Sequence, residues 1–276
     1  MTYKIYIMKK ILKHIIIWLL GDSKFRNLQK DFYFKRNKNK VDELYLISKY
    51  FRKNNKNGVM IDVGVHNGQS SELFLDMGWK VYGFEPDEIN KNKIPSHVIN
   101  NSKMTLFECA LSNENGEMSF YRSNESTGIS SLLNFHETHK EAKKVPVRKL
   151  QEVIDENKIR DINVLKIDTE GYDLFVLKGL DINKYSNLDI IFCEFEDNKT
   201  LKLNYSVHDM ADFLLRNDYK IIVCEWFPII RYGVEHKFKS ANKYPCPISE
   251  NGWGNLLAYK NEKFEQYFFN EIKSKK

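Results

Sequence analysis

Cysteine is scarce in this chain, with four residues among 276 and no C-x-x-C pair. Cys109, Cys193 and Cys224 lie in apolar, strand-like runs, and Cys246 lies between two prolines. Disulfide frameworks and zinc sites need closely spaced cysteines, so the sequence argues against both. We expect buried, reduced thiols in a cytoplasmic protein, and no metal site.

The chain also lacks an apolar run long enough for a membrane-spanning helix, which takes about 20 residues. Residues 11–20 are mostly apolar, but Lys13 and His14 interrupt them and no small-residue cleavage site of a signal peptide follows. Two interpretations stay open for residues 1–20. They form either a basic amphipathic helix on the inner face of the membrane or a helix packed on the domain.

A strong excess of one charge is absent as well. Lysine and arginine number 43 and aspartate and glutamate 37, which gives a net charge of +6. The surplus lies in residues 4–13, 24–56 and 273–276, so the middle of the chain is not basic. Nucleic-acid-binding proteins usually carry a basic stripe on a folded face, and we therefore expect no nucleic-acid partner.

What the chain does contain is an alternation of apolar runs with helical patterns. Expected strands cover residues 59–63, 80–85, 104–111, 163–168, 189–195, 219–225 and 255–259. Helical periods lie between most of them, for example at residues 70–77, 173–180 and 207–216. This order predicts an α/β fold with a doubly wound, mostly parallel, seven-stranded sheet of the Rossmann-like kind.

The remaining segments predict how the chain is divided. Residues 1–57 form an N-terminal helical, basic extension, residues 58–260 the main domain, and residues 261–276 a C-terminal helix and basic tail. A turn at residues 113–116 followed by a strand at 117–121 predicts an added hairpin. Two long inserts, at residues 123–144 and 226–253, contain no expected strand. A short extended stretch at residues 145–147 follows the first insert.

The first expected strand ends in a pattern typical of nucleotide sites. Asp62, Gly64 and Gly68 form D-x-G-x-x-x-G, and the second strand ends in Glu85, placed to bind ribose hydroxyls. A pyrophosphate-binding turn reads G-x-G-x-x-G, but here His66 replaces the middle glycine and Asp62 would repel a phosphate. The pattern favours S-adenosylmethionine, whose sulfonium and amino group are positive, over a dinucleotide.

Carboxylates end most of the expected strands. Because ligands of open α/β sheets bind outside the carboxyl ends of the strands, these acids predict an acidic rim that attracts a cationic cofactor. Each acid taken alone is equally well explained as a helix cap or a solvated loop residue. The set comprises Asp62, Glu85, Asp168, Glu170, Glu194, Glu196 and Glu225.

Residues 165–174, L-K-I-D-T-E-G-Y-D-L, resemble the signature of FkbM-type methyltransferases. The I-D-V-G turn, the F-E-P strand end, the A-L-S turn and the C-E-F strand end are similar to that family in the same order, over residues 58–196. The resemblance implies a class I enzyme that uses S-adenosylmethionine, commonly to O-methylate a sugar or a secondary metabolite.

The resemblance also implies roles for individual residues. Asp62, Gly64 and Gly68 would line the methionine end of the cofactor, Glu85 would bind the ribose, Ala110 and Leu111 would edge the adenine, and Asp168 would lie beside the reacting centre; Asn67 is counted with the cofactor-binding residues. His66 departs from the family pattern, because many relatives carry a small residue there. It either contacts the ligand carboxylate or faces solvent, and we favour solvent.

A sugar hydroxyl is a poor nucleophile, so a general base would assist methyl transfer. Asp168 and Glu170 are the first candidates, Glu194 is the second, and a histidine among His136, His139 and His208 is the third. The first two histidines are three residues apart, which would suit a metal on a helix, but the neighbouring acids would point elsewhere.

The two inserts are expected to select the acceptor. Aromatic residues of the second insert, such as Trp226, Tyr232 and Trp253, would stack on a sugar or simply cap the core. The sequence therefore predicts an O-methyltransferase acting on a sugar hydroxyl of a surface glycan or its precursor. Alternatives are a methyltransferase acting on a small molecule or RNA, disfavoured by the absence of an N-P-P-Y tetrad, and a non-catalytic cofactor-binding subunit.

Overall fold

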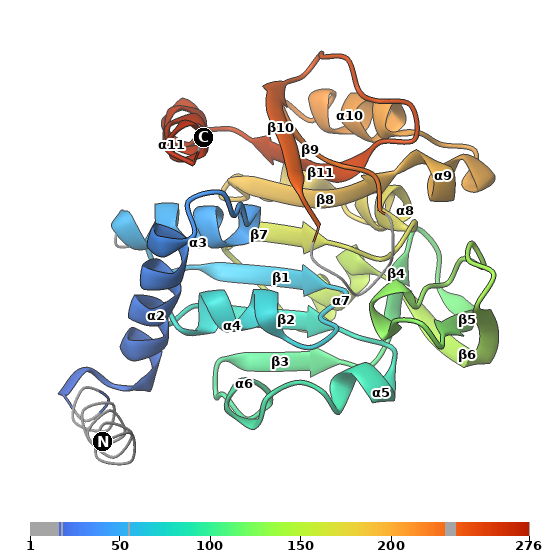
Figure 1. Cartoon of the computed structure of the whole chain (residues 1–276). Helices are drawn as coiled ribbons and strands as arrows, with labels where there is room; N and C mark the ends of the chain where they lie inside the picture. Colours follow the sequence, from blue (N-terminus) through green and yellow to red (C-terminus); the bar gives the residue numbers. More distant parts are fainter. Residues whose placement is uncertain (1–16, 18, 55, 230–235, 276) are drawn as a thin grey trace, which may run out of the picture.

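The computed structural model describes residues 17, 19–54, 56–229 and 236–275. An eight-stranded sheet runs through its centre in the order β10-β9-β11-β8-β7-β1-β2-β3 (Figure 1). Its strands are β1 (Val59–Val63), β2 (Lys80–Phe84), β3 (Met104–Phe107), β7 (Ile162–Ile167), β8 (Ile190–Glu196), β9 (Lys220–Trp226), β10 (Phe238–Lys243) and β11 (Trp253–Tyr259).

The strand pairing confirms the predicted doubly wound, mostly parallel sheet. β1 lies between β2 and β7 and is parallel to both, so the strand order reverses beside it. β11 runs antiparallel between β8 and β9. An eighth strand, β10, arises within the segment expected to be a loop, because it pairs antiparallel with the edge of β9.

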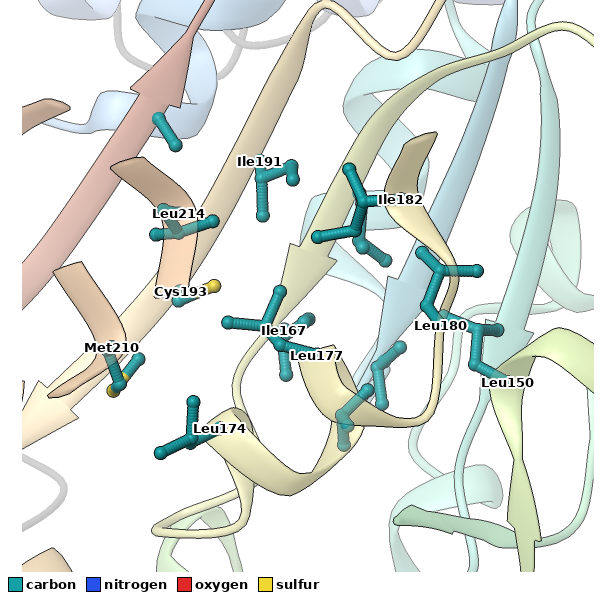
Figure 2. Close-up of a cluster of buried hydrophobic side chains, with 14 of the residues drawn as sticks. Leu150, Ile167, Leu174, Leu177, Leu180, Ile182, Ile191, Cys193, Met210 and Leu214 are labelled. Carbon is teal, nitrogen blue, oxygen red and sulfur yellow. The ribbon is translucent and has the colours of Figure 1, made fainter. Parts of the chain in front are cut away.

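Helices cover both faces of the sheet, as the hydrophobic patterns require. One face packs against α3 (Glu43–Lys53), α4 (Gln69–Leu75) and α11 (Glu262–Lys273), which contribute buried side chains such as Leu46, Phe74 and Phe268. The other face packs against α7 (Leu150–Glu156), α8 (Asp173–Lys178) and α10 (Val207–Leu215). Figure 2 shows part of this second core. Such coverage explains why β1, β7 and β8 are almost continuously apolar.

A second, three-stranded sheet stands at the carboxyl end of the main sheet, in the order β4-β6-β5 (Figure 1). It consists of β4 (Ala110–Ser112), β5 (Gly116–Ser123) and β6 (His139–Lys149). The expected strand at residues 104–111 is therefore divided between the two sheets. The expected hairpin is wrong, because β6 lies between β4 and β5. The strand after the turn pairs antiparallel with β6, whose polar first half gave no strand signal, and not with the strand before the turn.

The shorter elements connect these layers. They are α2 (Asp22–Arg36), α5 (Glu88–Lys91), α6 (Ser96–Ile99) and α9 (Asp197–Thr200), with 3-10 turns at Thr127–Ile129, Ile182–Lys184 and Leu201–Leu203. In the described part of the chain, no helix combines the length and the apolar character needed to cross a bilayer. Residues 1–16 and 18, on which most of the expectation for the N-terminus rests, lie outside the described residues.

Candidate active site

A cleft opens at the carboxyl ends of β1, β2 and β7, where the strand order reverses and the three-stranded sheet adds a wall. It holds about 640 Å³ of empty space, which includes open solvent at its mouth. The lining residues on which the argument below depends are Gly64, His66, Phe84, Glu85, Asn90, Cys109, Ala110, Leu111, Ser130, Asp168 and Glu170.

Two glycines shape the first loop, for reasons of packing within the protein. Gly64 has φ +81°, and a Cβ atom there would lie 2.0 Å from the backbone oxygen of Asp168. Gly68 also has φ +81°, and its Cβ would lie 3.0 Å from Ile94. The segment that follows β7 and the segment before α6 therefore approach the loop so closely that glycine is needed at both positions.

Asp62 is fully buried and is not among the lining residues of the cleft. Its carboxylate accepts a hydrogen bond of 2.6 Å from the Ser71 hydroxyl and lies 3.3 Å from the ammonium of Lys166. Lys166, also buried, donates a 2.6 Å bond to the Gly64 carbonyl and lies 3.4 Å from Asp168. Lys166 therefore joins the ends of β1 and β7 below the cleft.

The ammonium of Lys166 stays protonated despite its burial. Burial alone would lower its pKa, but the carboxylates of Asp168 and Asp62 raise the pKa above its ordinary value. Sequence reasoning gave this residue no role. The signal in the sequence was a lysine inside the apolar run that forms β7. A charge buried there needs a partner of opposite charge, because an unpaired charge is too costly to bury.

Glu85 lies at the end of β2 with its carboxylate in the cleft wall. Its two oxygens accept bonds from the backbone N–H groups of His66 (2.8 Å) and Asp87 (2.9 Å). Burial raises the pKa of Glu85, while these N–H donors lower it. The donors fix the orientation of the carboxylate, and its binding of ribose hydroxyls stays a prediction.

Two of the three residues between Gly64 and Gly68 lie differently from our expectation. His66 does not simply face solvent: it lines the cleft, with φ +52°, and its Nε2 lies 3.3 Å from the Thr127 hydroxyl. Burial lowers its pKa, which favours the neutral imidazole. Asn67 is not among the lining residues and instead accepts a weak bond from the Gln69 N–H at 3.4 Å.

Two polar atoms in the cleft wall lack a hydrogen-bond partner among the described residues. They are the side-chain oxygen of Asn90, beside Glu85, and the hydroxyl of Ser130. Buried polar atoms are rarely left unpaired in native proteins, so both are suited to a polar ligand. Neither residue was predicted, because nothing in its sequence context shows that it faces a cleft.

An apolar wall completes the part of the cleft beyond Glu85. Ala110 and Leu111 are buried on β4 and line the cleft, as do Phe84 and Cys109. Such a surface fits a flat heteroaromatic ring better than a charged group. The two residues expected to edge an adenine therefore lie in the apolar part of the cleft, and their contact with an adenine stays a prediction.

The structure brings together the three carboxylates expected to supply a general base. Asp168, Glu170 and Glu194 each place one oxygen within 4.8 Å of the others, although Glu194 is not among the lining residues. Such a cluster would also suit a cation, so the expected absence of a metal stays a prediction. The third-choice histidines His136, His139 and His208 are likewise absent from the lining of the cleft.

Lys199 balances the charge of this cluster. Its buried ammonium lies 2.5 Å from Glu170, 2.6 Å from Glu196 and 3.7 Å from Glu194. Burial raises the pKa of Glu170 to about 7, against the opposing effect of Lys199. Burial, followed by the charge of Glu170, raises the pKa of Glu194 still further.

The acids at the sheet edge therefore do not form a uniformly negative rim. Lys166 and Lys199 are inserted among them, and Lys239 lies 3.0 Å from Glu225. Asp168 is the most accessible of the acids in the cleft, with 39% of its side chain exposed. The strand-end acids therefore create little long-range negative potential that could attract a cationic cofactor. Direct contacts with Glu85 and Asp168 are better suited to bind it.

The fold and the cleft define a class I methyltransferase that uses S-adenosylmethionine, and the residues fit this cofactor. A fixed buried carboxylate, an apolar wall and two unpaired polar atoms face one cavity. The chain belongs to the family of the methyltransferase FkbM domain, whose model matches residues 62–221. The predicted family, enzyme class and cofactor are thereby confirmed.

Solved structures with a similar chain course are more distant. The precorrin-6Y C5,15-methyltransferase of Geobacter metallireducens is 12% identical, with a TM-score of 0.44 and coverage of 79% of this chain and 88% of that one. An O-methyltransferase of Bacillus cereus in complex with SAH is 10% identical, with a TM-score of 0.42 and coverage of 91% and 97%. No curated protein matches this chain in sequence.

Proposed function

We propose that this methyltransferase acts on oxygen and that its acceptor is a sugar hydroxyl of a surface glycan or its precursor. The observation that carries the proposal is the pair of acids Asp168 and Glu170 in the cleft wall, beside the position expected for the methyl donor. A hydroxyl acceptor has a proton to lose, and a carboxylate at that place can take it.

Glu85 would hold the ribose hydroxyls, Ala110 and Leu111 the adenine, and the loop from Gly64 to Gly68 the methionine end. Asn90 and Ser130 are additional candidates for polar contacts. When bound, the cofactor supplies a methyl group on a sulfonium, which is already an activated leaving group. The chain's own contribution is alignment of the two reactants and exclusion of water.

Glu170 is our preferred general base. It would accept the hydroxyl proton, and Lys199 would hold its carboxylate toward the cleft by their 2.5 Å contact. Asp168 and Glu194 are the alternatives. The acceptor itself would be selected by the first insert, since Ser130 and Leu132 line the cleft from that segment. Trp226 and Trp253 of the second insert contact each other at a tilt, with ring centroids 5.9 Å apart, outside this lining.

Calorimetry with S-adenosylhomocysteine tests the cofactor site. Glu85→Ala should weaken binding about tenfold to a hundredfold, because it removes charged hydrogen bonds to the ribose. Glu85→Gln should give an intermediate loss. Glu88→Ala, a neighbouring acid with 65% of its side chain exposed, serves as the control. Unchanged affinity in Glu85→Ala, with unchanged thermal unfolding, would refute the ribose assignment.

Activity with labelled cofactor tests the acceptor. A panel of nucleotide sugars and glycolipids should contain a substrate that yields an alkali-stable methyl ether, as expected for a methylated hydroxyl. Methylation of RNA or of a non-sugar small molecule instead would replace the proposed acceptor. Tight cofactor binding without transfer to any acceptor would favour a non-catalytic subunit.

A further inference from the structure

Helix α2 is oriented with its polar residues toward the protein. Arg26 donates bonds of 2.9 Å to the Asp76 carboxylate, and Lys30 lies 2.8 Å from Glu72. On the same side, Asp31 accepts a 2.8 Å bond from the Tyr45 hydroxyl. No residue of α2 is fully buried. Phe34 also packs against the core and stacks on Tyr45 with ring centroids 4.1 Å apart, so the helix is attached to the domain by this apolar contact as well as by ion pairs and hydrogen bonds.

The outward face of α2 presents exposed apolar side chains between cations. Leu28 and Phe32, one helical turn apart, are 52% and 66% exposed, and just before the helix Leu19 is 65% exposed. Five of the nine large apolar side chains that are exposed in the described residues lie between positions 19 and 33. A surface helix normally turns such residues toward the core, so the exposure of Leu28 and Phe32 indicates a partner.

The charges around this face identify the chemistry of the partner. Lys24, Lys35, Arg36 and Lys38 are all exposed on or next to α2, against one exposed acid, Asp22. In the sequence, α2 is preceded by further lysines and by the apolar residues 11–20. Exposed apolar side chains bordered by cations are typical of helices that lie flat on anionic lipid.

From these observations we infer that the outward face of α2, centred on Leu28 and Phe32, docks this enzyme on an anionic membrane surface. Figure 1 places α2 at the end of the sheet from which the parallel strands start, whereas the cleft lies at their carboxyl ends. Docking through α2 therefore turns the cleft away from the lipid. The acceptor would reach it from the aqueous side.

Co-sedimentation of the full chain with vesicles tests the inference. The chain should bind vesicles of phosphatidylglycerol and phosphatidylcholine in equal parts, bind phosphatidylcholine alone far less, and be released by salt. The double variant Leu28→Ser/Phe32→Ser should lower the partition coefficient about tenfold or more. Leu201→Ser, at a side chain 60% exposed elsewhere on the molecule, should leave it unchanged.

Several results would overturn the inference. Absence of binding to anionic vesicles would do so, and equal binding by the double variant would place the lipid contact elsewhere, for example in residues 1–16. Sedimentation without lipid could also reveal a dimer whose formation depends on protein concentration. If the double variant abolished that dimer, the partner of this face would be a second copy of the chain. Calorimetry with S-adenosylhomocysteine should give the same affinity for both proteins, so failure here is distinct from failure of the proposed activity.

Discussion

Two buried lysines decide what the acids of the cleft can do. Lys166 forms an ion pair with Asp62, which is buried outside the cleft. Lys199 forms an ion pair with Glu170, which lines the cleft. An acid that keeps a raised pKa and still contacts a cation can exchange a proton near neutral pH. Glu170 is therefore the carboxylate that we expect to take the proton of the acceptor.

Glu170→Gln tests the choice of base. The amide cannot accept a proton, so kcat should fall about a hundredfold or more, while the affinity for S-adenosylhomocysteine changes little. In the unsubstituted enzyme, the rate should rise as the pH passes about 7, because the Glu170 carboxylate forms there. The variant should lose this rise.

Stopped-assay rates between pH 5 and 9 would provide the measurement. Glu125→Gln, an acid of the first insert that does not line the cleft, is the matched control. A normal rate in Glu170→Gln, together with a large loss in Asp168→Asn, would transfer the base to Asp168.

Residues of the site differ in how far the sequence reveals them. Gly64, Glu85 and Asp168 could be located because strand ends and motif spacing place them at one edge. Asn90 and Ser130 could not, since their exposure to the cleft depends on how α5 and the first insert fold over it. The sequence favours a solvent-facing His66, whereas the left-handed turn at this residue places it in the cleft lining.

At the scale of elements, β1 and β7 depend on Lys166 for their junction. Lys166→Met keeps the volume but leaves Asp62 buried without a counter-charge, which should lower the free energy of unfolding by about 3–5 kcal/mol. The double variant Asp62→Asn/Lys166→Met should recover part of this loss. Urea unfolding would measure both, with the exposed Lys178→Met as control. A loss below about 1 kcal/mol in Lys166→Met would show that the pair is dispensable.

The elements missed from the sequence share one property. β10 and the first half of β6 are polar strands at sheet positions fixed by tertiary pairing, with few apolar residues to reveal them. In contrast, β1, β7 and β8 are buried on both faces and were evident as apolar runs. Sequence patterns report burial, so strands that are half exposed give a weaker signal.

For the whole molecule, the distribution of buried acids predicts how stability depends on pH. Glu43 begins α3 and is only 4% exposed, and its carboxylate accepts bonds from Trp226 (2.8 Å) and Asn255 (3.2 Å). It thereby connects α3 to β9 and β11. Burial raises the pKa of Glu43 to about 7, and burial likewise raises the pKa of Asp173 to about 6.

Because these pKa values are higher in the folded than in the unfolded state, the folded protein binds more protons between pH 5 and 7. The stabilisation is fully present below the ordinary carboxyl pKa and is lost as the pH rises through about 6 to 7. The contribution of these two acids to the free energy of unfolding should therefore decrease from pH 5 to pH 8. Glu43→Gln keeps the hydrogen-bonded shape without the charge, so the decrease should be smaller by about 1–3 kcal/mol.

Urea unfolding curves at pH 5 and pH 8 test this, with the exposed Glu114→Gln as the matched control. We expect Glu43→Gln to resemble the unsubstituted protein at pH 5 and to exceed it at pH 8. Equal destabilisation at both pH values would contradict the prediction. Such a result would mean that the amide does not replace the hydrogen bonds to Trp226 and Asn255. The destabilisation would then come from the lost bonds and not from the charge of Glu43.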